Sequence, residues 1–246
     1  MKHQPILVTL AIVALLTCGA CGSFSGVHRP ELAVVPPSQV VDFNALYGQN
    51  CAGCHGVGGK GAAAVALANP VFLAIADDTV IRRIASNGVP GTPMPAFAQS
   101  AGGMLTDRQI DALVRGIRSW AKPNALRDTT PPPYAAPAPG DAQRGADAYR
   151  TYCFSCHGAD GRGGSKASSI VDGSYLTLVS DQQLRTIVIA GRPELGAPDW
   201  RGDVEGRPMS PQDISDVVAW LSSQRPQFPG QPYPTASINP ANGGSR

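Results

Sequence analysis

Residues Cys51–Gly56 read CAGCHG, and the pattern returns at Cys153–Gly158 as CFSCHG. Each stretch has two cysteines separated by two residues and a histidine directly after the second cysteine. This CxxCH pattern is typical of covalent c-type haem attachment. Two thiols one helical turn apart can each add to a vinyl group at one edge of a porphyrin, and the adjacent imidazole can ligate iron beneath the ring. The sequence therefore predicts two covalently bound haems (iron), attached through Cys51, Cys54, Cys153 and Cys156 and ligated by His55 and His157.

Paired cysteines have two other common uses in proteins. A thioredoxin-like CxxC requires a βαβ context, which the sequence does not show. A zinc site built from all four cysteines would leave both histidines unexplained and would tie together two segments that each look complete. The third pair, Cys18 and Cys21, is followed by Gly22 where a haem site requires histidine. It therefore predicts no third haem.

The segments around the two motifs are repeats of one unit. A glycine-rich turn follows each motif, and a helical stretch then ends at Gly88 in one copy and at Gly191 in the other. Thr106 with Gln109 predicts the cap of a last helix, and Ser210 before Pro211 predicts its counterpart. Apolar residues recur there with the period of one helix face, and no sustained alternation predicts strands. We expect an all-α protein with two small helical haem domains, each of a size that often needs a cofactor to complete its core.

Composition divides the chain into six parts. We expect a signal peptide at 1–20, a flexible tether at 21–40, the first domain at 41–122, a proline-rich linker at 123–140, the second domain at 141–225 and a disordered tail at 226–246. The linker's prolines favour an extended, semi-rigid spacer. The formal net charge of +2 gives no reason to expect nucleic acid as a partner.

The first residues have the form of an export signal. Lys2 precedes the apolar run ILVTLAIVALL, which is of signal-peptide length and short for a membrane span. The following LTCGACGS resembles a bacterial lipoprotein cleavage site, with Ala20 before the cut and Cys21 as the lipid-carrying residue; an ordinary signal peptide cut nearby is the alternative. Either form predicts a periplasmic protein, and the lipoprotein form anchors it at the outer face of the cytoplasmic membrane.

With these motifs the chain resembles the small class I c-type cytochromes in tandem dihaem form, from about Val41 to Arg225. The resemblance implies a few helices around one haem in each domain, with the first and last helices crossing near the attachment site. By analogy, Tyr47 and Trp120 would pack at that crossing in the first domain. Tyr149 would lie near Val217 and Leu221 in the second.

The family's second iron ligand is usually a methionine in a proline-rich loop before the last helix. Met94 in GTPMPAF matches that place, whereas Met104 suits packing. Aligning the copies at their glycines puts Ala197 opposite Met94, and alanine cannot bind iron. Met209 is one candidate replacement, and its other reading is an apolar contact of the last helix, opposite Leu105. Water or no ligand is an equal alternative, and His28 in the tether is a remote one.

These features predict an electron carrier rather than an enzyme. The resemblance implies single-electron relay between respiratory-chain partners such as a quinol-oxidising complex, a terminal oxidase or a periplasmic dehydrogenase. The alternative is a haem enzyme or a module that binds gas or peroxide at the sixth position of the second haem. Three cations, Lys60, Arg162 and Arg185, are expected as solvated surface charges, with haem propionates or a docking partner as other roles.

Overall fold

The computed structural model describes residues 34–122, 125–126, 129–202 and 204–227. The expected signal peptide, Cys21, His28 and most of the tail lie outside these residues. The chain divides into two units, Met1–Gln39 and Val40–Arg246. Among the described residues the first unit contains only the short 3-10 helix Pro37–Gln39.

The described part of the chain contains ten α-helices and no strands, which confirms the all-α prediction. The first half of the large unit contains α2 (Phe43–Asn50), α3 (Ala52–His55), α4 (Pro70–Ile75), α5 (Asp78–Asn87) and α6 (Asp107–Arg118). The second half repeats this order with α7 (Ala142–Tyr152), α8 (Phe154–His157), α9 (Gly173–Leu178), α10 (Asp181–Ala190) and α11 (Pro211–Ser223). Short 3-10 turns occur at Val57–Gly59, Gln99–Ala101 and Pro193–Leu195.

Side-chain caps fix where these helices begin. Thr106 and Gln109 form the predicted capping box of α6, with the Thr106 N–H donating to Gln109 Oε1 at 3.0 Å. Ser210 caps α11 in the same way, together with Asp213. The sequence of this stretch also predicts a cap at Asp78 or Thr79 for α5, and this was wrong by one or two residues: Asp77 accepts from the Val80 N–H at 2.8 Å. The aspartate one residue earlier is the one whose carboxylate reaches the third helical N–H.

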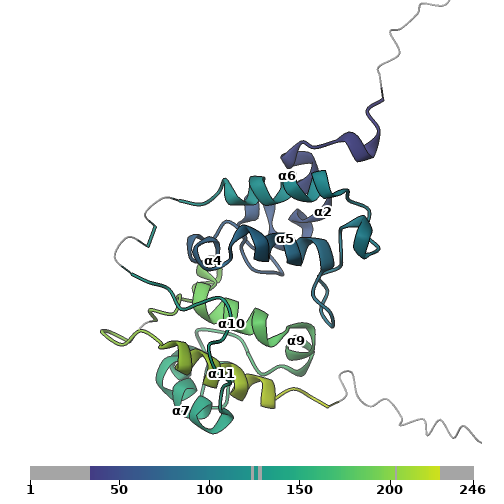
Figure 1. Cartoon of the computed structure of the whole chain (residues 1–246). Helices are drawn as coiled ribbons and strands as arrows, with labels where there is room; N and C mark the ends of the chain where they lie inside the picture. Colours follow the sequence, from purple (N-terminus) through teal and green to yellow (C-terminus); the bar gives the residue numbers. More distant parts are fainter. Residues whose placement is uncertain (1–33, 123–124, 127–128, 203, 228–246) are drawn as a thin grey trace, which may run out of the picture. The chain divides into compact units, whose positions relative to one another are not determined.

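The first and last helices of each half lie side by side, α2 with α6 and α7 with α11 (Figure 1). A glycine permits each close approach. A Cβ on Gly116 of α6 would lie 2.0 Å from the Phe43 ring, and a Cβ on Gly145 of α7 would lie 2.0 Å from the Asp216 carbonyl oxygen. Both crossings therefore depend on the missing side chain.

An arginine at or just beyond the end of each last helix contacts the end of the short helix that follows the CxxCH motif. Arg118 donates to the carbonyls of Leu73 and Ala76 and pairs with Asp78. Arg225 makes the same set of contacts in the second half, donating to Leu176 O at 2.9 Å and to Val179 O at 2.8 Å, and pairing with Asp181. The two arginines thus have one role, although they stand at different places relative to the last helix.

The end of the proline-rich linker is bonded to the second half. Arg185 of α10 is 2% exposed and donates to the Pro133 carbonyl at 2.9 Å and to the Tyr134 carbonyl at 3.1 Å. Gln182 donates to the same Tyr134 carbonyl at 2.8 Å. The expectation that Arg185 is a solvated charge was therefore wrong, because the linker carbonyls satisfy its guanidinium inside the protein.

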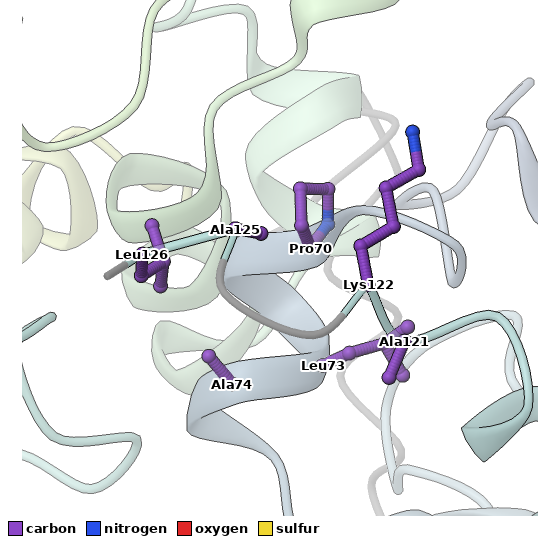
Figure 2. A pocket seen from close by; sticks show the side chains of 7 residues that line it. All are labelled: Pro70, Leu73, Ala74, Ala121, Lys122, Ala125 and Leu126. Atoms are coloured by element: carbon purple, nitrogen blue, oxygen red, sulfur yellow. The ribbon is translucent and has the colours of Figure 1, made fainter.

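A shallow pocket of about 260 Å³ lies between α4 and four residues after α6, namely Ala121, Lys122, Ala125 and Leu126 (Figure 2). Its lining is apolar apart from Lys122, and Pro70, Leu73 and Ala74 form the α4 side. None of the predicted haem residues contributes to it. Across the described ranges, no helix has the length and apolar character needed to cross a membrane.

Candidate functional site

The first CxxCH motif forms a tight turn directly after α2. Asp42 starts α2 by accepting from the Ala45 N–H at 2.8 Å, and the helix ends at Cys51, where φ is −121°. The chain then re-enters a helix, with the His55 N–H donating to Cys51 O at 2.9 Å. Cys51 and Cys54 therefore lie within one turn, and both are free thiols.

The second motif has the same backbone. Cys153 ends α7 at φ −118°, and α8 carries Cys156 and His157. The Cys156 N–H donates to Cys153 O at 3.2 Å, the distance that also separates Cys54 N from Cys51 O. These thiols are free as well. The two sites are thus copies in geometry as well as in sequence.

Each motif histidine is oriented by a backbone carbonyl. His55 Nδ1 lies 2.8 Å from Val65 O, and His157 Nδ1 lies 2.8 Å from Ser168 O. Because a carbonyl can only accept, Nδ1 carries the proton, and Nε2 keeps its lone pair for a metal. Paired thiols within one turn and an imidazole with a free Nε2 are the donor set that covalent haem requires. The residues present therefore fit the group.

A tyrosine hydroxyl fixes the end of each motif. Tyr47 donates to Gly56 O at 2.8 Å and Tyr149 to Gly158 O at 2.5 Å. Both rings are buried against tryptophans: Tyr47 meets Trp120 edge-on at 5.0 Å, and Tyr149 stacks on Trp220 at 4.3 Å. The predicted contact between Tyr47 and Trp120 is confirmed.

These contacts include two features that the sequence reading missed. One is the hydroxyl bond, whose only signal was a tyrosine four residues before the first cysteine of each motif. The other is Trp220, which lies in α11 beside the predicted neighbours Val217 and Leu221. It stands at a different helical position from Trp120, so aligning the two copies could not reveal it.

Burial shapes the acid–base properties of the site. Burial and the neighbouring cysteine raise the pKa of Cys51 and of Cys153 to about 11, so both are held as neutral thiols at pH 7. Burial also lowers the pKa of His55, which the Val65 carbonyl opposes and the positive charge of Arg192 assists. His55 is thus kept neutral, the form that can ligate a metal.

The two motif histidines differ in how far their side chains are buried. His55 is buried, with 8% of its surface exposed, whereas His157 is partly exposed. The loop after α10 contacts the loop that follows the first motif: Arg192 donates to Ala62 O at 2.6 Å and pairs with Glu194. A Cβ on Gly61 would lie 2.7 Å from the Glu194 carboxylate. Residues of the second half therefore complete the surroundings of the first site.

A buried asparagine provides a second link between the halves. Asn69 Oδ1 caps α4 by accepting from the N–H groups of Val71 and Phe72 at 2.8 and 3.2 Å. Its Nδ2 donates to Ala190 O, the last carbonyl of α10, at 2.9 Å. One side chain therefore satisfies the ends of two helices from different halves.

The candidate second ligands occupy different surroundings. Met94 is half-buried in the loop between α5 and α6, where its N–H donates to Thr92 Oγ1 at 3.2 Å. Met209 is 7% exposed and packs in the apolar core. Met104 is 82% exposed, so the expectation that it packs was wrong; the turn before α6 points it outward. The roles of Met94 and Met209 as ligands stay predictions.

Nothing in the described part of the chain gathers three or more histidine, cysteine or acidic side chains into a group that could hold a metal ion. The two cysteine pairs thus remain separate sites, each with its own histidine.

Comparison with known families gives a match in both halves. Residues 38–115 and 140–221 match the family described as cytochrome c oxidase, cbb3-type, subunit III. The two matched ranges contain both CxxCH motifs and all ten described α-helices, apart from the last turns of α6 and α11.

Individual relatives carry related names. The chain is 24% identical over 220 residues to the cytochrome bc1 complex cytochrome c subunit of Mycobacterium bovis, covering 86% of this chain and 74% of the relative. The subunit of that name from Mycobacterium tuberculosis matches to the same extent. The cbb3-type cytochrome c oxidase subunit CcoP of an Azospirillum species is 35% identical over 140 residues, 52% of this chain and 42% of the relative. Among solved structures, a reducing HAO-like protein complex from Kuenenia stuttgartiensis matches with a TM-score of 0.40 and 19% identity, covering 78% of this chain and all of the other.

Proposed function

The chain belongs to the family described as cytochrome c oxidase, cbb3-type, subunit III, and from this we propose that it is a dihaem carrier that passes single electrons between respiratory-chain partners at the outer face of the cytoplasmic membrane. Membership makes it a c-type cytochrome whose haem is bound covalently and serves electron transfer. The count of two haems, the partners and the location belong to the proposal.

One observation carries the dihaem proposal. Both motif histidines donate Nδ1–H to a carbonyl at 2.8 Å beside a pair of free thiols. A chain that used only one motif would need only one of these arrangements. Cys51 and Cys54 would hold the first haem, with His55 as a ligand for its iron, and Cys153 and Cys156 would hold the second, with His157 in the same role. Bound haem supplies a one-electron Fe(III)/Fe(II) couple.

Hydrogen bonds within the chain orient the histidine of each motif. The carbonyls of Val65 and Ser168 fix the imidazole tautomers, and the hydroxyls of Tyr47 and Tyr149 hold the glycine that follows each histidine. Met94 is proposed as the sixth ligand of the first haem, where thioether ligation raises the reduction potential.

The names of the relatives support the choice of partners. One relative is named as a subunit of a bc1 complex and another as a subunit of a cbb3 oxidase. A quinol-oxidising complex as donor and a terminal oxidase as acceptor are therefore the proposed pair, with a periplasmic dehydrogenase as another donor. The location rests on the export signal and on Cys21.

A spectropotentiometric titration of the purified holoprotein tests the function. We expect reversible absorption changes that require two one-electron steps per chain. A chain whose haem absorption does not change reversibly with applied potential would contradict electron transfer. A fit to one step, with one haem counted per chain, would contradict the dihaem form.

A further inference from the structure

The loops that carry Met94 and Ala197 have one backbone design. Each loop follows a helix that ends at a glycine of positive φ, 66° at Gly88 and 68° at Gly191. The next residue closes the loop: Val89 N–H donates to Met94 O, and Arg192 N–H donates to Ala197 O, both at 3.0 Å. Ala197 therefore stands at the place of Met94 in three dimensions as well as in the alignment.

The loop is also held against its helix in the same way in both halves. A Cβ on Gly88 would lie 2.6 Å from Met94 O, and a Cβ on Gly191 would lie 2.8 Å from Ala197 O. Because the glycines touch the loop backbone directly, no shift of the second loop compensates for the shorter side chain. The methionine sulfur simply has no counterpart at this position.

Met209 has a different counterpart in the first half. The Met209 N–H donates to Trp200 O at 2.8 Å, and the Leu105 N–H donates to Phe97 O at 2.7 Å. Both residues directly precede the cap of the last helix, and each is 7% exposed within the apolar core. Leucine cannot bind a metal, so this is a packing position, and Met209 fills it.

The charged side chains beside Ala197 are committed to each other. Asp199 and Arg201 stand where the first half has Ala96 and Ala98. Arg201 Nε donates to both Asp199 carboxylate oxygens, at 2.9 and 3.2 Å, and its guanidinium lies 5.0 Å from the Trp200 ring centre. The carboxylate is thus engaged by the guanidinium rather than free to ligate iron.

We propose that the second haem has no protein side chain as its sixth ligand and that it binds small exogenous ligands such as carbon monoxide and nitric oxide. This inference rests on the proposed haem at Cys153, Cys156 and His157 and adds a ligand-binding site to the proposed carrier. The first haem, with Met94, serves as an internal comparison.

Carbon monoxide added to the reduced holoprotein tests the inference, after the haem on each motif peptide has been counted in the same preparation. We expect a spectral change in half of the haem and a high-spin ferric signal from half of the iron by electron paramagnetic resonance. Ala197→Met should abolish both and should add a second long-wavelength charge-transfer band of methionine-ligated ferric haem. Met94→Ala should extend the carbon monoxide response to both haems.

Met209→Leu is the matched control, because the first half carries leucine at this position and the fold accepts it there. We expect the variant to keep the wild-type spectra, both with and without carbon monoxide. A wild-type protein with two haems and no carbon monoxide response would overturn the inference and leave the dihaem carrier intact. A response that appears only in Met209→Leu or in His28→Ala would overturn it by identifying that residue as the ligand. Absence of haem from the second motif would overturn both proposals.

Discussion

Replacing Asn69 tests the buried link between the two halves of the large unit. Asn69→Ala removes three hydrogen bonds at once: two that cap α4 and one to Ala190 O at the end of α10. The residue is 6% exposed, so water cannot readily replace them. We therefore expect a cost well above that of an ordinary helix cap.

The magnitude follows from the two parts. Loss of an N-cap costs about 1 kcal/mol. Leaving a buried carbonyl without a donor costs about 1–3 kcal/mol. Asn69→Ala should therefore lower the free energy of unfolding by about 2–4 kcal/mol. Asn69→Ser keeps a capping oxygen and loses only the bond to Ala190, so it should cost about 1–3 kcal/mol.

Urea unfolding of the holoprotein, followed by far-UV circular dichroism, measures these differences from the midpoint at constant slope. Asp172→Ala is the matched control, because Asp172 caps α9 at the corresponding place but is exposed and caps only one helix. It should cost about 1 kcal/mol or less. Asn69→Ser with wild-type stability, or Asn69→Ala no worse than Asp172→Ala, would refute the reasoning.

Three further predictions concern helix packing, acid stability and the anchor. Gly145→Ala should destabilise the protein by about 1–3 kcal/mol in thermal melts through overpacking, because its Cβ would meet Asp216 O at 2.0 Å. The control Gly48→Ala, whose Cβ meets nothing within 4 Å, should be neutral or slightly stabilising in the same melts. Equal effects of the two variants would contradict the proposed crossing. Burial would raise the pKa of Asp216, but hydrogen bonds from Arg144, the Asp141 N–H and Gln212 outweigh it and lower the pKa. The contribution of the Asp216 carboxylate to stability is therefore present above the unfolded-state pKa of about 3.9 and is lost as pH falls through the lower folded-state value. Asp216→Asn should therefore reduce the loss of unfolding free energy that the protein shows on acidification. A loss of the same size in the variant would contradict this role of Asp216. Cys21→Ser should leave both haems bound but move the protein from the membrane to the periplasmic fraction of an expressing cell, whereas unchanged membrane association would exclude the lipid anchor.

Local patterns in the sequence predicted much of the fold. The CxxCH motifs, the capping box at Thr106 and the helix-ending glycines Gly88 and Gly191 are each set by residues close together in the chain. Such features can be recognised without knowledge of the tertiary structure, because their hydrogen bonds join residues that are close in sequence. The resemblance to class I cytochromes then placed Tyr47 against Trp120, as the structure confirms.

The links between distant segments could not be read in this way. Arg118 and Arg225 bind backbone carbonyls, which leave no mark in the sequence, and they stand at unaligned positions. Asn69 resembles an ordinary cap before Pro70, and only the folded chain brings Ala190 to its amide. Arg185 resembles a surface charge on an amphipathic helix until the linker carbonyls cover it. In each case the partner is a main-chain atom far away in sequence.

Mass analysis of the denatured, protease-digested holoprotein tests the central claim most directly. The protein must be made in a host that matures c-type cytochromes, so that the thiols have access to haem. The account predicts one covalent haem on the peptide that contains Cys51 and Cys54 and one on the peptide that contains Cys153 and Cys156. Unmodified thiols on either peptide of the mature protein would contradict it.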